Sequence, residues 1–189
     1  SHAAGMFTTF SNNMISMSSD RAGTSSHDGL IMQGANSICS GNTIIGAKGV
    51  GISFSMLIGD GTPTTVRISD NTVIMDDEGY ISPSTVGMNA IYVYSDDIYG
   101  PDDIRGVQIT GNSFGGGQSA LNGFHHIRLR VDKPSATMKN VMISNNISAD
   151  PADAPTCYIQ MEGASSTAEK VNVIGNNFHS SGSHNGVYL

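Results

Sequence analysis

An asparagine-centred motif recurs six times along the chain, and this repetition limits the possible folds more than any other feature. The copies read FSNNMI, CSGNTI, ISDNTV, ITGNSF, ISNNIS and VIGNNF, and their shared asparagines are Asn13, Asn42, Asn71, Asn112, Asn146 and Asn176. Successive asparagines are 29, 29, 41, 34 and 30 residues apart. A repeat of roughly 20–50 residues indicates a solenoid or a propeller.

Each repeat also carries two segments with the alternation of a β-strand. Three residues before each asparagine stands an apolar side chain, as Ile68 and Ile109 show. A second apolar segment follows, usually entered through glycine, and the six segments span 29–32, 51–56, 90–95, 126–131, 158–162 and 186–189. A propeller blade would need about four strands joined by hairpin turns. Hairpin dipeptides are scarce here, so the pattern favours a parallel β-helix with one coil per repeat.

In such a helix the repeated asparagine has a structural role. A sharp corner between two strands requires a residue that tolerates the left-handed backbone region, and asparagine does so well. Coils stack at about 4.8 Å, so the asparagine side chains can also hydrogen-bond to one another as a ladder. We therefore expect Asn71 and its equivalents to belong to the scaffold rather than to a functional site.

The combination of IxxNxI with a glycine-led GIxL strand resembles the repeat of pectate-lyase-like proteins, a superfamily that includes many bacteriophage tailspikes. The resemblance covers nearly the whole chain. It implies an all-β, single-stranded right-handed parallel β-helix of about six coils with an asparagine ladder, forming one domain over residues 1–189. In that family the glycine-led sheet commonly floors a carbohydrate groove. The fold alone does not choose among lyases, hydrolases, epimerases and binding proteins.

The resemblance has further implications for assembly and location. Tailspikes are similar in being trimers of parallel β-helices, so the expected partners are a polysaccharide and two further copies of the chain, at a virion tail or another extracellular place. The chain stops within a glycine-led segment at 186–189, and neither end shows an amphipathic capping helix. Solenoids need covered ends, so we expect a fragment of a longer chain or a protomer capped by partner subunits.

Composition and cysteine spacing agree with a β-helix and exclude some classes. Only 13% of residues are charged, against about 25% in an average domain, and helix-type periodicity is almost absent. The net charge of −7 argues against a nucleic-acid partner, and no long apolar run predicts a membrane span. Cys39 and Cys157 lie about three coils apart, beyond the roughly 7 Å limit for a disulfide. We expect two free, buried thiols.

The outward positions of the glycine-led sheet gather most of the tyrosines and two arginines. Aligning Ile91, Ile127, Ile159 and Val187 predicts one lateral row of Tyr92, Arg128, Gln160 and Tyr188. It predicts a second row of Tyr94, Arg130 and Glu162, and a third with His126 beside Tyr158, while His125 falls on the inward phase. Aromatic faces stack on sugars, and arginine pairs with sugar carboxylates. The alternative is that these residues merely suit exposed strands.

Acidic residues flank the strand at 90–95 and supply candidate catalytic groups. A hydrolase needs two carboxyl groups about 5–10 Å apart, and Asp96 or Asp97 against Glu162 could provide them. A lyase would instead use Arg128 or Arg130 to neutralise a carboxylate, with His126 or a tyrosine as the base. Clustered Asp residues could also bind Ca²⁺, but no DxDxDG loop supports this, so the sequence predicts no cofactor.

Two functions from different classes therefore remain open. The first is a tailspike-type depolymerase, a hydrolase or a lyase, that binds and cleaves a bacterial surface polysaccharide. Its candidate catalytic residues are Asp96, Asp97, Glu162 and His126. Its candidate binding residues are Tyr92, Tyr94, Arg128, Arg130, Tyr158, Gln160 and Tyr188. The second is a non-catalytic β-helix that acts as a structural shaft or holds a glycan without cutting it.

Overall fold

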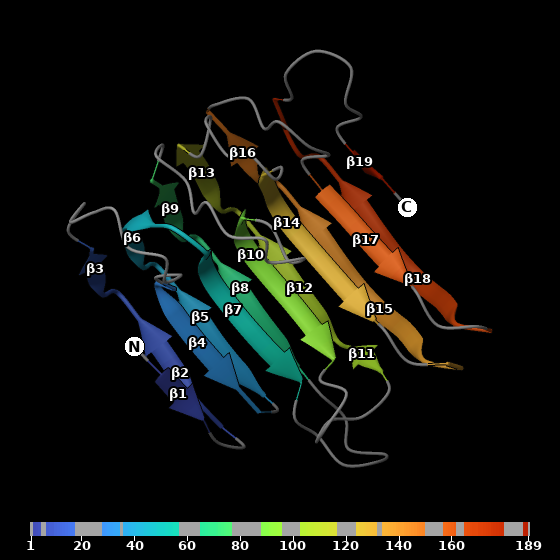
Figure 1. Ribbon diagram of the computed structural model, residues 1–189. Helices are drawn as coiled ribbons and strands as arrows, with labels where there is room; N and C mark the ends of the chain where they lie inside the picture. The colour runs from blue at the N-terminus through green and yellow to red at the C-terminus, as the bar shows by residue number, and fades with distance from the viewer. Residues whose placement is uncertain are drawn as a thin grey trace.

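The described part of the protein is a parallel β-helix. The computed structural model describes residues 2–4, 7–17, 28–34, 36–56, 65–76, 88–95, 103–116, 124–131, 134–149, 157–161, 165–179 and 187–188. The regular elements within these ranges are strands, arranged in three parallel sheets. In Figure 1 the strands of successive coils lie side by side in chain order, from the blue N-terminal end to the red C-terminal end. The predicted all-β fold with stacked coils is confirmed.

Sheet A contains seven strands that follow one another in chain order through the stack. They are β1 (His2–Ala4), β4 (Leu30–Gln33), β7 (Val50–Met56), β10 (Met88–Ser95), β14 (Phe124–Val131), β17 (Cys157–Met161) and β19 (Val187–Tyr188). The last six coincide with the six glycine-led segments that the sequence predicts, whereas β1 has no counterpart among them. One outer and one inner face follow from the alternation of side chains along these strands.

Sheet B carries the segment before each ladder asparagine. Its strands are β2 (Thr9–Ser11), β5 (Ser37–Ser40), β8 (Val66–Ser69), β12 (Val107–Thr110), β15 (Thr137–Ser144) and β18 (Thr167–Ile174), with the short β11 (Ile104–Arg105) also beside β15. Gly106, at φ 64°, separates β11 from β12 and lets both pair with the longer β15. The left-handed conformation costs glycine little, so the chain can change direction there without strain.

Sheet C carries the segment after each ladder asparagine. Its strands are β3 (Met14–Ser16), β6 (Thr43–Ala47), β9 (Thr72–Met75), β13 (Ser113–Gly116) and β16 (Ile147–Ser148). A single bridge from Ile147 to Asn177 carries the same pairing into the sixth coil. One coil therefore consists of a strand from sheet A, then one from sheet B, the asparagine corner, and one from sheet C.

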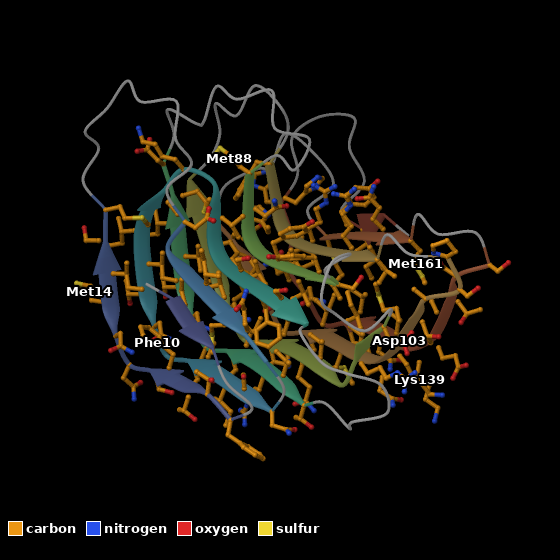
Figure 2. All side chains as sticks on the ribbon, turned by 60° about the horizontal axis from the view of Figure 1, so that its bottom comes forward. Phe10, Met14, Met88, Asp103, Lys139 and Met161 are labelled. Atoms are coloured by element: carbon orange, nitrogen blue, oxygen red, sulfur yellow. The ribbon has the colours of Figure 1, made fainter. Side chains whose placement is uncertain are left out.

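The core is a set of stacked apolar rungs between the three sheets. Ile68, Ile109 and Ile143 are adjacent in register and have no exposed surface. The rungs are less covered in the first coil, where Phe10 is only partly buried. In Figure 2 Met14, on the outer side of the same coil, points away from the sheets, in line with its exposure of 74%. The middle coils thus hold the best-packed part of the core.

The two cysteines are free and buried, as predicted. Cys39 lies in sheet B and Cys157 in sheet A. Burial raises the pKa of each thiol from 9.0 to about 12, and a hydrogen bond from Asn42 lowers that of Cys39 slightly against this effect. A thiol with so high a pKa is almost entirely protonated at neutral pH and is a poor nucleophile. Both cysteines therefore serve the core.

The asparagine ladder is continuous over all six coils. Each asparagine donates its Nδ2 to the Oδ1 of the next, at 3.1, 2.9, 2.9, 2.9 and 2.8 Å from Asn13 to Asn176. The backbone N–H of each also donates to that same Oδ1 at 3.0 Å. Asn42, Asn71, Asn112 and Asn146 are at most 1% exposed. The expected scaffold role of the asparagines is confirmed.

The reason expected for the asparagine at the corner is wrong in one respect. The left-handed residue is the one before the ladder asparagine, at φ between 56° and 68°. These residues are Asn12, Gly41, Asp70, Gly111, Asn145 and Gly175. Asn or Asp thus alternates with glycine from coil to coil, a set that we term the alternating column. A Cβ on Gly111 would lie 2.5 Å from Oδ1 of Asp70, so the larger side chain occupies space that only glycine leaves open.

Candidate functional site

The outer face of sheet A brings the predicted tyrosines and arginines together, in two lateral rows. The first row consists of Ile31, Ser53, Tyr92, Arg128 and Tyr158. The second row consists of Gln33, Ser55, Tyr94, Arg130 and Gln160. Neighbouring members of a row are about 4.8 Å apart, the spacing of parallel strands. The gathering of these side chains on one face is therefore confirmed.

The register between β14 and β17 differs from the predicted one by two residues. Ile127 pairs with Cys157 rather than with Ile159, which pairs with Leu129. Tyr158 therefore stands beside Arg128 where Gln160 was expected, and Gln160 takes the position beside Arg130 that was expected for Glu162. A shift of two residues keeps every side chain on its predicted face, because the pleat has a period of two. Hydrophobic alternation cannot detect such a shift.

The first row is held together by stacked rings and a buried guanidinium. The Cζ of Arg128 lies 5.6 Å from the ring centroid of Tyr92 and 5.5 Å from that of Tyr158. Tyr92 also stacks on Tyr94 at 4.8 Å, and Tyr158 packs against His125 at 5.0 Å. The Nη2 of Arg128 donates to Oε1 of Gln160 at 2.6 Å. Contacts of this kind between a cation and aromatic faces fix the orientation of all partners.

Burial separates the two rows. Arg128 is 6% exposed and Tyr92 is 7% exposed, so neither presents much surface. In the second row Tyr94, Arg130 and Gln160 are partly exposed, whereas Ser55 is fully buried. The accessible part of the site therefore lies mainly along the second row, with the first row beside it as a rigid support.

The two histidines of β14 have exchanged the roles that the sequence predicts. His126, expected on the outer face as a candidate base, is fully buried inside the helix. Its ring lies 5.5 Å from that of Phe114 and 4.7 Å from that of Phe124. His125, expected to face inward, instead contacts Tyr158 on the outer face. The predicted outward position of His126 is therefore wrong, and His125, only 9% exposed, is the histidine that lies beside the outer-face tyrosine Tyr158.

A bend in sheet A explains the exchange. A Cβ on Gly51 in β7 would meet Val73 and Met75 of sheet C, so position 51 points inward. The next residue, Ile52, is fully buried and points inward as well. Two consecutive inward residues mean that the strand turns a corner there, and simple alternation fails across it. His126 and Ile127 occupy the same corner in β14. The glycine at position 51 is the sequence feature that could have indicated this bend.

Several candidate residues have no described geometry. Asp96, Asp97 and Glu162 lie outside the described residues. Tyr188 belongs to β19, where its backbone pairs with Tyr158 and extends the first row by one coil. The strands of sheet A, over the residues that the structure describes, contain no Asp or Glu.

The described ion pairs lie away from this face. Lys48 and Asp76 are joined at 3.6 Å beyond the ends of β6 and β9, and Lys139 and Glu169 are joined at 2.6 Å across β15 and β18. Lys139, mainly through its hydrogen bond, lowers the pKa of the Glu169 carboxyl. Asp103, labelled in Figure 2, accepts a hydrogen bond at 2.6 Å from the backbone N–H of Thr137, the first residue of β15. No group of three or more His, Cys, Asp or Glu side chains among the described residues is arranged to hold a metal ion.

Comparisons with protein-family models, with curated proteins and with solved structures found no match to this chain. Among the described residues, no helix is long and apolar enough to cross a membrane. The repeat and the outer face of sheet A are therefore the features from which a function can be argued.

Proposed function

We propose that the protein is a carbohydrate-binding β-helix that holds a bacterial surface polysaccharide along the outer face of sheet A. The observation that carries this proposal is the set of partly exposed side chains Tyr94, Arg130 and Gln160, of which Tyr94 is stacked on the buried Tyr92 and Gln160 is bonded to the buried Arg128. Ring faces and planar polar groups are the side chains that contact sugar C–H groups and hydroxyls.

The row geometry supports an extended ligand rather than a small one. The second row crosses five neighbouring strands from Gln33 to Gln160. Four steps of about 4.8 Å make this row about 19 Å long. Ser55 within the row is fully buried, so a chain of several sugars lying along it would contact Gln33 at one end and the run from Tyr94 to Gln160 at the other. Such a ligand agrees with the tailspikes that the repeat resembles, whose substrates are polysaccharides.

Binding is proposed in preference to cleavage because of the charges that the face carries. A glycoside hydrolase uses two carboxyl groups, and none stands in the described strands of sheet A. Cleavage would depend on Asp96, Asp97 and Glu162, which lie outside the described residues. We therefore propose that the protein binds a polysaccharide, and the binding assay below also tests whether it cleaves the polysaccharide.

The test uses capsular polysaccharides and lipopolysaccharide glycans immobilised on a surface, with the protein applied in solution. Tyr94→Ala is expected to weaken binding about tenfold, equivalent to about 1.4 kcal/mol. The matched control is Gln108→Ala, which removes an exposed side chain of the same coil from sheet B. Equal effects of the two variants, or no capture of any glycan by the wild type, would refute the proposal.

The same incubation separates the binder from the two enzyme classes. Hydrolysis releases new reducing ends, and β-elimination also creates an unsaturated uronate that absorbs in the ultraviolet. A binder yields neither signal while it retains the glycan. The release of either product would replace the binding proposal by a hydrolase or a lyase.

The proposal includes a homotrimer, which rests on the resemblance of the repeat to tailspikes. One chain has a mass of 19.7 kDa. Sedimentation equilibrium is expected to give three times this mass, and a single-chain mass across the concentration range would exclude the trimer.

A further inference from the structure

The two arginines of the outer face differ in what they can offer to a ligand. Both face outward from β14, at positions separated by one residue. Arg128 has an aromatic ring on each side of its guanidinium and donates through Nη2 to Gln160. A carboxylate binds arginine best through two parallel N–H groups at the edge of the guanidinium. Arg128 is only 6% exposed, so a ligand has little access to such an edge.

Arg130 stands in the more open row. Its lateral neighbours are Tyr94 on β10 and Gln160 on β17, and all three are partly exposed. Tyr94 is itself fixed by stacking on Tyr92 at 4.8 Å, with 16° between the ring planes. Gln160 is fixed by Arg128. The first row therefore holds Tyr94 and Gln160 in place, and Arg130 lies between them at the surface.

From this division we propose that Arg130 is the specificity-determining residue of the glycan site, and that it selects polysaccharides bearing carboxylate groups. Arg128 is a positioning residue, which acts through Tyr92 and Gln160 without contacting the ligand. The inference rests on the proposed glycan-binding function. A cation beside a fixed ring favours a sugar chain in which acidic residues accompany apolar sugar faces.

The experiment compares one glycan in two forms. The probe is the acidic polysaccharide that the wild-type protein retains most strongly in the binding assay, together with its carboxyl-reduced derivative, which keeps the same linkages. The wild type is expected to bind the acidic form at least about tenfold more tightly, and this preference is expected to shrink as salt is added. Arg130→Gln is expected to weaken binding of the acidic form far more than binding of the reduced form, so that the ratio of the two affinities falls to about one.

Two further variants distinguish selection from positioning. Arg130→Lys keeps the charge without the planar fork, so part of the preference is expected to return. Arg128→Gln removes the group between Tyr92 and Tyr158, so binding to both forms is expected to fall by similar factors. Circular dichroism of each variant verifies that the β-helix is intact, and Arg128→Lys replaces Arg128→Gln if the latter fails to fold.

Each outcome bears on the inference. Retention of the preference by Arg130→Gln, or equal binding of both forms by the wild type, overturns it while the glycan-binding function stands. If Arg128→Gln loses the preference and Arg130→Gln keeps it, Arg128 is the selecting residue and the inference is overturned. If the wild type captures no polysaccharide, the proposed function fails and this inference fails with it.

Discussion

The asparagine ladder should contribute most to stability in the middle of the stack, and Asn112→Ala tests this directly. The Nδ2 of Asn112 donates to Asn146 Oδ1 at 2.9 Å and to the carbonyl of Ile68 at 3.0 Å. Its Oδ1 accepts from the backbone N–H of Asn71 at 3.0 Å and from Nδ2 of Asn71 at 2.9 Å. Its Nδ2 also donates to the carbonyl of Thr110 at 3.3 Å, and alanine removes all five hydrogen bonds at a position with no exposed surface.

The cost follows from the groups left without partners. The backbone N–H of Asn71 and one of its Nδ2 protons lose their acceptor, whereas the Ile68 carbonyl still faces the paired strand β12. Asn146 Oδ1 keeps the hydrogen bond from the backbone of residue 112. At about 1–3 kcal/mol for each of the two orphaned buried groups, Asn112→Ala should destabilise the fold by about 2–6 kcal/mol. That is a large part of the roughly 5–15 kcal/mol available to a domain.

Asn13→Ala is the matched control, because the same substitution is made at the exposed end of the same ladder. Asn42 Oδ1, its acceptor, keeps the hydrogen bond from the backbone N–H of residue 13. We expect a loss below about 1 kcal/mol. Urea unfolding followed by far-ultraviolet circular dichroism measures both. Equal losses in the two variants would show that the ladder is not the source of the stability.

Three further predictions concern the scaffold. Gly111→Ala places a Cβ at φ +68° and 2.5 Å from Asp70 Oδ1, so the free energy of unfolding is expected to fall by about 2–4 kcal/mol. Adding Asp70→Gly should recover part of this loss in thermal unfolding. No recovery would contradict the steric explanation. Because burial raises the pKa of Cys39 and Cys157 from 9.0 to about 12, the folded state keeps protons that the unfolded state releases above 9.0. The contribution of the two thiols to stability is complete below pH 9.0 and falls as pH rises towards 12. Alanine at both sites should therefore reduce the alkaline loss of stability measured by urea unfolding at several pH values. An unchanged slope of stability against pH would refute the assignment. Ser55→Ala should be neutral or stabilising by up to about 1 kcal/mol, because its buried hydroxyl has no hydrogen-bond partner among the described residues; a clear loss would reveal a bond to that oxygen.

Repetition made the fold predictable. Each coil repeats the same inward apolar residues and the same corner asparagine, so an error in one copy is corrected by the others. Ile68, Ile109 and Ile143 align in sequence and also stack in the core. Alternation with a period of two then assigns the outer face of a straight strand, which is why Tyr92, Arg128 and Arg130 were placed correctly.

The candidate site was less predictable because it depends on features that differ between coils. The bend at the start of β14 reverses the faces of His125 and His126, and alternation assumes a straight strand. The lateral order along β17 depends on backbone pairing, and a two-residue shift leaves the hydrophobic pattern unchanged. Tyr158 therefore stands where Gln160 was predicted, and Gln160 stands where Glu162 was predicted. Burial of Arg128 between two rings is a property of three strands together, which no single segment reveals.

The alternating column makes the true structural unit of this solenoid two coils long. Asn145 fits against Gly175 as Asp70 fits against Gly111, because each larger side chain needs a glycine in the following coil. Deleting the coil of Gly111 would place Asp70 directly against Asn145, and inserting one coil would create a similar conflict or an empty space. A helix of this type can therefore be lengthened or shortened without penalty only by coils taken in pairs, a constraint on its evolution and on any engineered change of its length.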